Sequence, residues 1–473
     1  MRKVLVLGGG LGGLSVAWML SRTGRFQVTV VEKEPSVGGL CSTFRHGDFS
    51  LDYGAHKVYS VIPGILDEFL GLMGEEVIKH KKKNSIFLFG KYLDYPVNIL
   101  DLMFKMGLKN LALCSINMLQ AIISKIGAHH SDDSYEDFVI NKFGHRLYSL
   151  VFKPLAEKVW GDPQSLSVDI AKTRIPSASI FDVLAMALGF KKKAANKDAQ
   201  FFYYPKGGFG RISERMCEEI KKHSGVVLVN TAVECLGLER NHIVKAVLKS
   251  NGKQEIIKTD LVISSIHLDA LVGLFPGDSE IRQDRFLDLV NRLEYRSLIL
   301  VYLFLDKEKI INDHWIFFPD SNLIFSRIFE QKNMDFNMAP KDRTVICCDF
   351  TDYGDGRLSR EEDSALAQRC ISQLEDIGLI NSGWVRDRLV KRFAKFYPRY
   401  NLNYKFNLRL IYKELQQFDN LLLTGRIGFY NYNNADHCLD MGKFIADRLI
   451  ENKDFSLIWQ ELEKRVSEYR IVD

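Results

Sequence analysis

Val4-Leu5-Val6-Leu7 leads directly into Gly8-Gly9-Gly10-Leu11-Gly12-Gly13, and a second apolar run, Val28 to Val31, ends on Glu32. This order predicts a buried strand, a tight glycine turn, a helix and a second strand, which is the βαβ unit of a dinucleotide site. Glu32 stands where a carboxylate accepts hydrogen bonds from both ribose hydroxyls, which disfavours the 2′-phosphate of NADP. A purely structural glycine turn would not require all of these parts at these spacings.

Each glycine of the turn has its own task in such a unit. Gly8 permits the tight turn, Gly10 lets the backbone approach a pyrophosphate, and Gly13 lets helix and strand pack closely. The N-terminus of the helix adds free N–H groups and a positive potential. The turn therefore predicts a bound dinucleotide.

A second glycine pair, Gly38-Gly39, follows Glu32 and indicates which dinucleotide binds. The stretch from Glu32 to Cys41 resembles the FAD-binding signature shared by amine oxidases, protoporphyrinogen oxidases, phytoene desaturases and UDP-galactopyranose mutases. The resemblance implies FAD, and we expect it to be non-covalent because neither His56 nor Cys438 has the context of an attachment point. The residues expected to contact the cofactor are Gly8, Gly10, Leu11, Gly12, Gly13, Glu32, Lys33, Gly39, Leu40, Val233, Gly425 and Arg426.

The composition is that of a large folded protein with a mild positive charge. The 473 residues, 46% of them hydrophobic, suggest two or three substructures with real cores. The net charge is +5, and the basic run 79–83 is more typical of solvated surface than of a nucleic-acid site, because no groove-reading motif accompanies it. Attraction to phosphate-bearing substrates or anionic lipid is the alternative.

The cysteines and the N-terminus favour a cytoplasmic protein. Eight cysteines without a CxxC pair are typical of reduced thiols, and we expect no metal site. The cofactor strand begins within four residues of Met1, which leaves no room for a signal peptide.

The segment from Val97 to Ile126 is rich in Leu, Ile and Met but carries scattered charges, so it cannot span a bilayer. Its spacing suits one or two amphipathic helices. We interpret them as packing within the substrate domain, with peripheral membrane contact as the alternative.

The predicted fold is α/β, with a Rossmann-type FAD-binding domain interleaved with a mixed α+β substrate domain. Strands at 225–229 and 243–248 precede a run ending at Ser265 that we expect to close the parallel sheet, and a helix is expected from Leu439 to Ile450. The FAD-binding domain is assigned to 1–60, 200–270 and 390–473. The substrate domain is assigned to 61–199 and 271–389, with a helical subdomain near 97–190.

Several separated stretches resemble the UDP-galactopyranose mutase-like branch of this FAD superfamily, and together they cover nearly the whole chain. They are Asp52-Tyr53-Gly54-Ala55-His56, Gly90-Lys91-Tyr92, Glu157-Lys158-Val159-Trp160-Gly161, Arg174-Ile175-Pro176, Tyr204-Pro205-Lys206-Gly207-Gly208-Phe209, Tyr295-Arg296-Ser297-Leu298, Phe325-Ser326-Arg327-Ile328 and Gly425-Arg426-Ile427-Gly428-Phe429-Tyr430-Asn431-Tyr432.

The resemblance implies roles for five side chains. Arg327 would lie near the flavin and a substrate diphosphate, Trp160 near a base or sugar, and Tyr430 and Tyr432 in the substrate cleft. His56 would orient the flavin ring. The structural alternatives are a core tryptophan, an arginine ion pair, tyrosines packed at an interface and a histidine that bonds backbone acceptors.

Two departures from the mutase pattern shape the functional prediction. Ala178 stands where mutases carry a second arginine that clamps the diphosphate, and Asn434 stands where they carry an aspartate. We therefore predict an FAD-dependent oxidoreductase that transfers a hydride from a carbohydrate-type or lipid-linked substrate to flavin N5. The alternatives are a mutase-like nucleotide-sugar isomerase that uses reduced FAD as a nucleophile, and a flavin-binding protein without catalysis.

Overall fold

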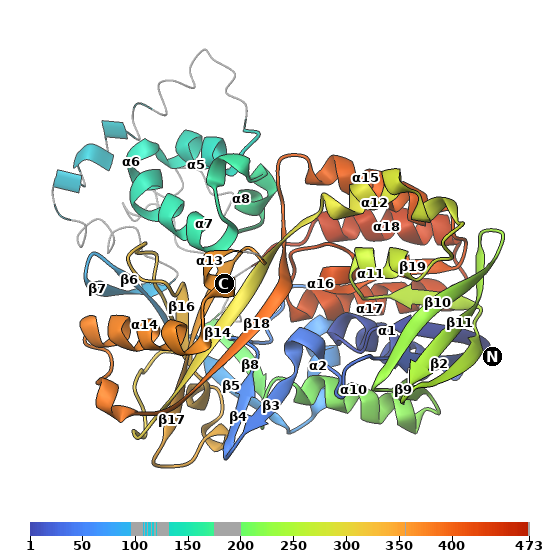
Figure 1. The fold of residues 1–473 in the computed structure, drawn as a ribbon, viewed down its shortest axis with the longest axis horizontal. Helices are drawn as coiled ribbons and strands as arrows, with labels where there is room; N and C mark the ends of the chain where they lie inside the picture. The colour runs from blue at the N-terminus through green and yellow to red at the C-terminus, as the bar shows by residue number, and fades with distance from the viewer. Residues whose placement is uncertain are drawn as a thin grey trace.

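The first strand leads into the glycine turn, as its apolar run predicts, and occupies the centre of a parallel sheet. The computed structural model describes residues 1–95, 132–174, 200–354 and 356–471, together with a few single positions between 107 and 120. Most of the segment from Val97 to Ile126, and Ala178, therefore lie outside the described residues. Figure 1 shows this sheet and its helices on one side of the molecule and a second sheet with long strands on the other.

The parallel sheet has the order β19-β13-β1-β2-β9. Its strands are β1 (Arg2–Leu7), β2 (Phe26–Val31), β9 (Val226–Leu228), β13 (Leu261–Ser264) and β19 (Leu421–Leu423), and each neighbouring pair is parallel. The prediction that the run ending at Ser265 closes the sheet is wrong. β13 lies inside the sheet because β19 pairs with its free side, so β19 forms that edge.

Helix α1 (Leu11–Ser21) follows the glycine turn and is buried along its whole length. It packs against α17 (Ala435–Ile450), where a Cβ on Gly442 would lie 2.4 Å from Cβ of Ser15. The predicted start of this helix at Leu439 is wrong by one turn. Asn434 and His437 form a capping box that begins the helix at Ala435.

The second large sheet has seven strands in the order β18-β14-β17-β16-β15-β6-β7. Its strands are β6 (Asn84–Leu88), β7 (Lys91–Tyr95), β14 (Glu294–Leu305), β15 (Trp315–Phe317), β16 (Arg327–Glu330), β17 (Thr344–Asp352) and β18 (Val385–Arg399). β14 is almost entirely buried, since β17 and β18 pair with its two edges and apolar side chains cover its faces.

Smaller elements complete the described part of the chain. The remaining strands are β3 (Thr43–His46), β4 (Phe49–Asp52), β5 (Val77–Lys81), β8 (Phe201–Pro205), β10 (Thr231–Glu239), β11 (His242–Ser250) and β12 (Lys253–Lys258). The remaining helices are α2 (Ile65–Met73), α5 (Tyr135–Phe143), α6 (His145–Leu147), α7 (Lys153–Trp160), α8 (Val168–Arg174), α10 (Arg211–Lys222), α11 (Leu268–Gly273), α12 (Asp284–Asn291), α13 (Arg357–Arg360), α14 (Asp363–Asp376), α15 (Tyr404–Leu415), α16 (Gly425–Gly428) and α18 (Phe455–Ser467).

This architecture confirms the predicted α/β class with a Rossmann-type parallel sheet and a mixed α+β part. The strands of the parallel sheet come from 1–60, 200–270 and 390–473, as the predicted domain division requires, whereas β18 crosses the boundary at residue 390. The division itself stays a prediction. Across the described ranges, every helix is too short or too polar to cross a membrane.

Candidate active site

A cavity of about 540 Å³ extends from the glycine turn, past the ends of the parallel strands, to the face of the seven-stranded sheet. The turn and α1 line one end of it. Aromatic and charged side chains of the seven-stranded sheet and of helices α7 and α8 line the other. We call these the cofactor end and the substrate end. Fifteen of the predicted site residues line the cavity: Gly8, Gly10, Leu11, Gly12, Glu32, Lys33, Gly39, Leu40, His56, Trp160, Val233, Arg327, Gly425, Arg426 and Tyr432.

The glycine turn has the geometry that a pyrophosphate requires. Gly8 has a φ of +97°, which glycine adopts without strain, and a Cβ on Gly13 would lie 2.2 Å from the carbonyl oxygen of Gly8. Gly13 therefore serves helix packing and does not line the cavity. Gly10 is different, because a Cβ there would meet no atom of the described residues within 4 Å. The protein itself does not require a glycine at this position, whereas a closely bound ligand does.

The start of α1 is equally open to a ligand. Gly10 is its N-cap, and no side chain caps the free N–H groups of the first turn. Such groups bind anions, and the helix dipole strengthens the attraction. The cradle therefore fits the pyrophosphate of a dinucleotide.

Glu32 lies at the end of β2, where its carboxylate is buried and faces the cavity. One oxygen accepts from the Gly9 amide at 2.7 Å and the other from the Glu34 amide at 2.9 Å. Each carboxylate oxygen keeps a second acceptor site, so the carboxylate can still accept from ribose hydroxyls. The same two bonds fix the side chain beside the glycine turn.

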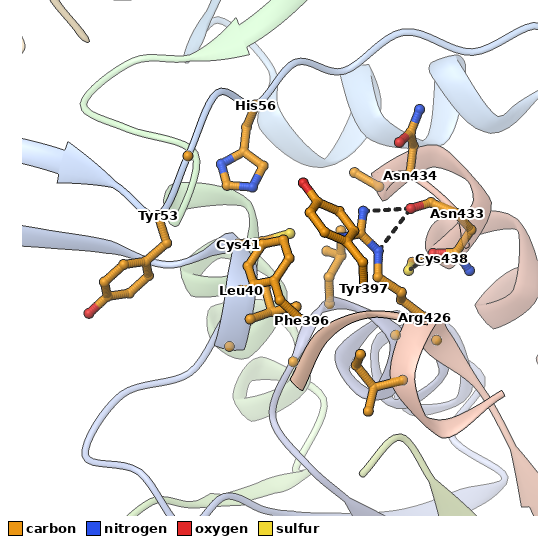
Figure 2. Close-up of a pocket in the computed structure, with 18 of the residues that line it drawn as sticks. Leu40, Cys41, Tyr53, His56, Phe396, Tyr397, Arg426, Asn433, Asn434 and Cys438 are labelled. Carbon is orange, nitrogen blue, oxygen red and sulfur yellow. Dashed lines mark hydrogen bonds between the residues drawn. The ribbon is translucent and has the colours of Figure 1, made fainter. Parts of the chain in front are cut away.

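Arg426 belongs to α16, whose first residue, Gly425, faces Gly12 so closely that a Cβ on Gly12 would lie 2.5 Å from Cα of Gly425. The Arg426 guanidinium donates to the carbonyl of Asn433, with a distance of 3.0 Å from Nε. Figure 2 shows these bonds and shows His56, Tyr397 and Arg426 turned toward one another.

His56 is held neutral at the centre of the cavity. Burial, reinforced by the positive charges of Arg426 and Arg327, lowers the pKa of His56 from its ordinary value to about 3. Its ring stacks on Phe209 with 4.7 Å between centroids, and Nδ1 has no hydrogen-bond partner among the described residues. A neutral imidazole offers one donor and one acceptor nitrogen, which suits it to orienting a polar ring.

Aromatic planes and cations alternate at the substrate end. The guanidinium of Arg174 lies 5.0 Å from the ring of Trp160 and 4.9 Å from that of Tyr432, which itself stacks on Tyr397 at 5.1 Å. Lys57 and Trp315 also line the cavity, with Lys57 Nζ 5.2 Å from the centre of the Trp315 ring. Cations at these distances are attracted to the ring faces.

Arg327 lies at the substrate end, but its charge is balanced. Its Nε donates to the Asp349 carboxylate at 2.7 Å across the β16–β17 pair. Asp349 is buried, and burial raises its pKa while the Arg327 guanidinium opposes that rise. The pair contributes little net charge to the cavity, so the predicted contact with a substrate diphosphate finds no unbalanced cation at Arg327.

Tyr430, by contrast, does not line the cavity. It is buried with a φ of +40°, and its hydroxyl donates to the backbone carbonyls of Glu294 and Arg399. Of these two tyrosines, Tyr430 packs in the interior and Tyr432 lines the cavity.

Sequence reasoning missed five residues of the substrate end: Lys57, Arg174, Trp315, Asp349 and Tyr397. Arg174 had a usable signal, because it opens a stretch already matched to the mutase-like pattern. The others carry no local signal. Their place depends on which strands pair and on strand register.

Comparison with known proteins gives one family and several relatives. A family model described as "flavin containing amine oxidoreductase" matches residues 11–430. An inactive all-trans-retinol 13,14-reductase of Danio rerio is 26% identical over 298 residues, which cover 55% of this chain and 47% of that protein. A 15-cis-phytoene desaturase of Synechococcus elongatus is 25% identical over 397 residues, covering 77% and 78%. The chain thus spans about half the length of the reductase and most of the desaturase.

Solved structures share the fold over nearly the whole chain. Reduced UDP-galactopyranose mutase superposes with a TM-score of 0.83 at 17% identity and covers 99% of both chains. Putrescine oxidase bound to putrescine superposes with a TM-score of 0.64 at 16% identity and covers 95% of this chain and 99% of its own.

Proposed function

This chain belongs to the family of flavin containing amine oxidoreductases and is an FAD-dependent enzyme, and we propose that it oxidises a C–H bond of a carbohydrate-type or lipid-linked substrate. FAD, bound non-covalently, supplies the hydride acceptor at N5. The residues of the chain bind the substrate, orient it and exclude water.

The cofactor end supports a definite arrangement of FAD. We assign the pyrophosphate to the Gly10 turn and the N-terminus of α1, the ribose to Glu32 and the adenine side to Val233. Arg426 and His56 would lie beside the flavin ring, where the low pKa of His56 makes it a weak base at neutral pH. We therefore assign His56 to orientation of the ring and not to proton transfer.

The side chains at the substrate end indicate which class of substrate binds there. Arg174 and Lys57 line it together with the aromatic rings of Trp160, Trp315 and Tyr432. A substrate with oxygen acceptors and a flat or apolar body satisfies both the donors and the aromatic planes.

A mutase-like reaction on a nucleotide sugar is the second candidate. The cation of Arg174 between two aromatic rings favours it, because a nucleotide diphosphate offers both a base to stack and an anion to bind. The pairing of Arg327 with Asp349 and the replacement of the second arginine by Ala178 weigh against it. A non-catalytic flavin carrier is less well supported, because its cleft would be blocked, whereas no side chain of the described ranges fills this cavity.

An anaerobic absorbance titration separates these functions. The purified protein is titrated with UDP, UDP-galactose and a panel of free and lipid-linked sugars, before and after reduction with dithionite. We expect a lipid-linked or free sugar to bleach the oxidised flavin and air to restore it. A saturable response to UDP that is tightest in the reduced protein would replace our proposal with the mutase, and no response to any compound would favour the carrier.

Cytoplasmic location and peripheral membrane contact remain predictions from the sequence. Sedimentation of the protein with vesicles of anionic lipid tests the second of them. Co-sedimentation with the vesicles is the expected sign of membrane contact.

A further inference from the structure

The last turn of α7 ends in the wall of the substrate end, and its backbone carbonyls do not end free. A helix leaves its last four carbonyls without helical partners. Gly161, with a φ of +86°, closes the turn by donating its amide to the carbonyls of Ala156 and Glu157 at 3.1 and 3.2 Å. Three carbonyls then remain, those of Lys158, Val159 and Trp160.

Side chains of the seven-stranded sheet bind all three. The hydroxyl of Thr351 on β17 donates to the carbonyls of Lys158 at 2.7 Å and Val159 at 2.9 Å. Arg399, at the end of β18, donates from Nε to the carbonyl of Trp160 at 2.8 Å. The sheet therefore acts as the C-cap of this helix.

Both capping side chains are themselves fixed. Arg296 donates from Nη2 to the Thr351 hydroxyl at 3.1 Å, which leaves the hydroxyl proton free to point at α7. Arg399 is buried and forms an ion pair with Glu294. Two guanidinium groups at a helix C-terminus also complement the helix dipole.

The capped turn ends at Trp160, the residue whose ring lies against Arg174 in the cavity. A frayed last turn would let this ring leave the wall, because only the backbone carbonyls tie it to the sheet through hydrogen bonds among the described residues. We propose that Thr351 and Arg399 are positioning residues, which hold Trp160 at the substrate end through the carbonyls of α7. Its contact with substrate rests on the proposed function, whereas its position does not.

Thr351→Val tests this proposal with little change in volume, and Thr351→Ser restores the hydroxyl. Ser297→Ala is the matched control: Ser297 is buried on the neighbouring strand, and its hydroxyl donates to the carbonyl of Asp352 without touching α7. The holoenzyme is labelled with fluorotryptophan, and Trp160→Phe identifies the Trp160 signal among the five tryptophans.

We expect Thr351→Val to shift or broaden the Trp160 fluorine resonance and to make the peptide 153–161 exchange amide hydrogens about tenfold faster, as the loss of one net hydrogen bond does. Thr351→Ser and Ser297→Ala should resemble the wild type in both measurements. An unchanged Trp160 signal in folded Thr351→Val, or equal changes in Ser297→Ala, would overturn the proposal.

Neither measurement uses a substrate, so a failure of the proposed function leaves this test valid. If Thr351→Val displaces Trp160 but leaves KM unchanged for the sugar that reduces the flavin, the positioning role stands and the substrate contact of Trp160 falls. Because Thr351 also lines the cavity, a rise in KM with kcat preserved supports both only when Trp160→Phe shows the same change.

Discussion

The substitution Gly10→Val should strongly weaken FAD binding while the apoprotein stays folded. Gly10 has φ −74° and ψ 170°, which any residue adopts, and a Cβ added there would lie more than 4 Å from every atom that the structure describes. The apoprotein should therefore lose about 1 kcal/mol of stability at most, the difference between glycine and valine at a helix N-cap. The side chain would instead fill the space that we assign to the pyrophosphate.

The expected loss of FAD affinity follows from the contacts removed. Two charge-assisted hydrogen bonds from the first turn of α1 are worth about 1.5–3 kcal/mol each. Their loss weakens binding by about 10²- to 10⁴-fold. Gly13→Ala is the control in which the stability of the apoprotein, and not the contact with FAD, is affected directly. Its Cβ would lie 2.2 Å from the Gly8 carbonyl oxygen, which should cost about 3 kcal/mol of apoprotein stability.

Two assays measure the two quantities. The flavin content of the purified protein and titration of the apoprotein with FAD give the affinity, and chemical unfolding of the apoprotein gives the stability. A Gly10→Val protein that retains FAD normally, or one whose apoprotein is as unstable as Gly13→Ala, would refute our assignment of the pyrophosphate site.

Three further predictions concern Arg327, Tyr430 and His56. Arg327→Ala should retain FAD, lose turnover and lose about 3–5 kcal/mol of stability, because Asp349 is left buried and unpaired. In chemical unfolding, the double variant Arg327→Met, Asp349→Leu should regain the stability, but it should not regain turnover. Full turnover in either variant would remove Arg327 from the site. Tyr430→Phe should lower stability by about 1–3 kcal/mol with turnover intact, so a loss of turnover without a loss of stability would contradict its packing role. In the folded protein the pKa of His56 is about 3, whereas in the unfolded chain it has its ordinary value of 6.5. The contribution of neutral His56 to the free energy of unfolding is therefore fully present above about pH 6.5 and is lost as the pH falls toward 3. The wild type should therefore lose about 3 kcal/mol more than His56→Asn between about pH 6.5 and about pH 4, and parallel unfolding curves would exclude this.

The cofactor end could be predicted from sequence because its geometry is local. The turn, the helix start and Glu32 lie within one βαβ unit, so spacing alone decides what they can bind. The order of the strands could not be read in the same way. Nothing near Ser265 indicates that β19 lies beyond β13, because that pairing depends on residues more than 150 positions away.

The substrate end shows why residue types alone do not assign roles. Tyr430 and Tyr432 look equivalent in the sequence, yet the positive φ of Tyr430 turns it into the packed interior. Whether a carboxylate balances the charge of Arg327 depends on the β16–β17 register, which places Asp349 opposite it. Such facts follow from tertiary pairing, and a local pattern does not contain them.

The contact of Gly12 with Gly425 has a consequence for how the protein folds. More than 400 residues of the chain separate the glycine turn from the wall that completes it, α16 with the start of α17. The cleft for the flavin is therefore complete only after this long loop has closed, and closure over so long a loop makes folding slow. FAD bound in this cleft therefore stabilises only those chains in which the two segments have met.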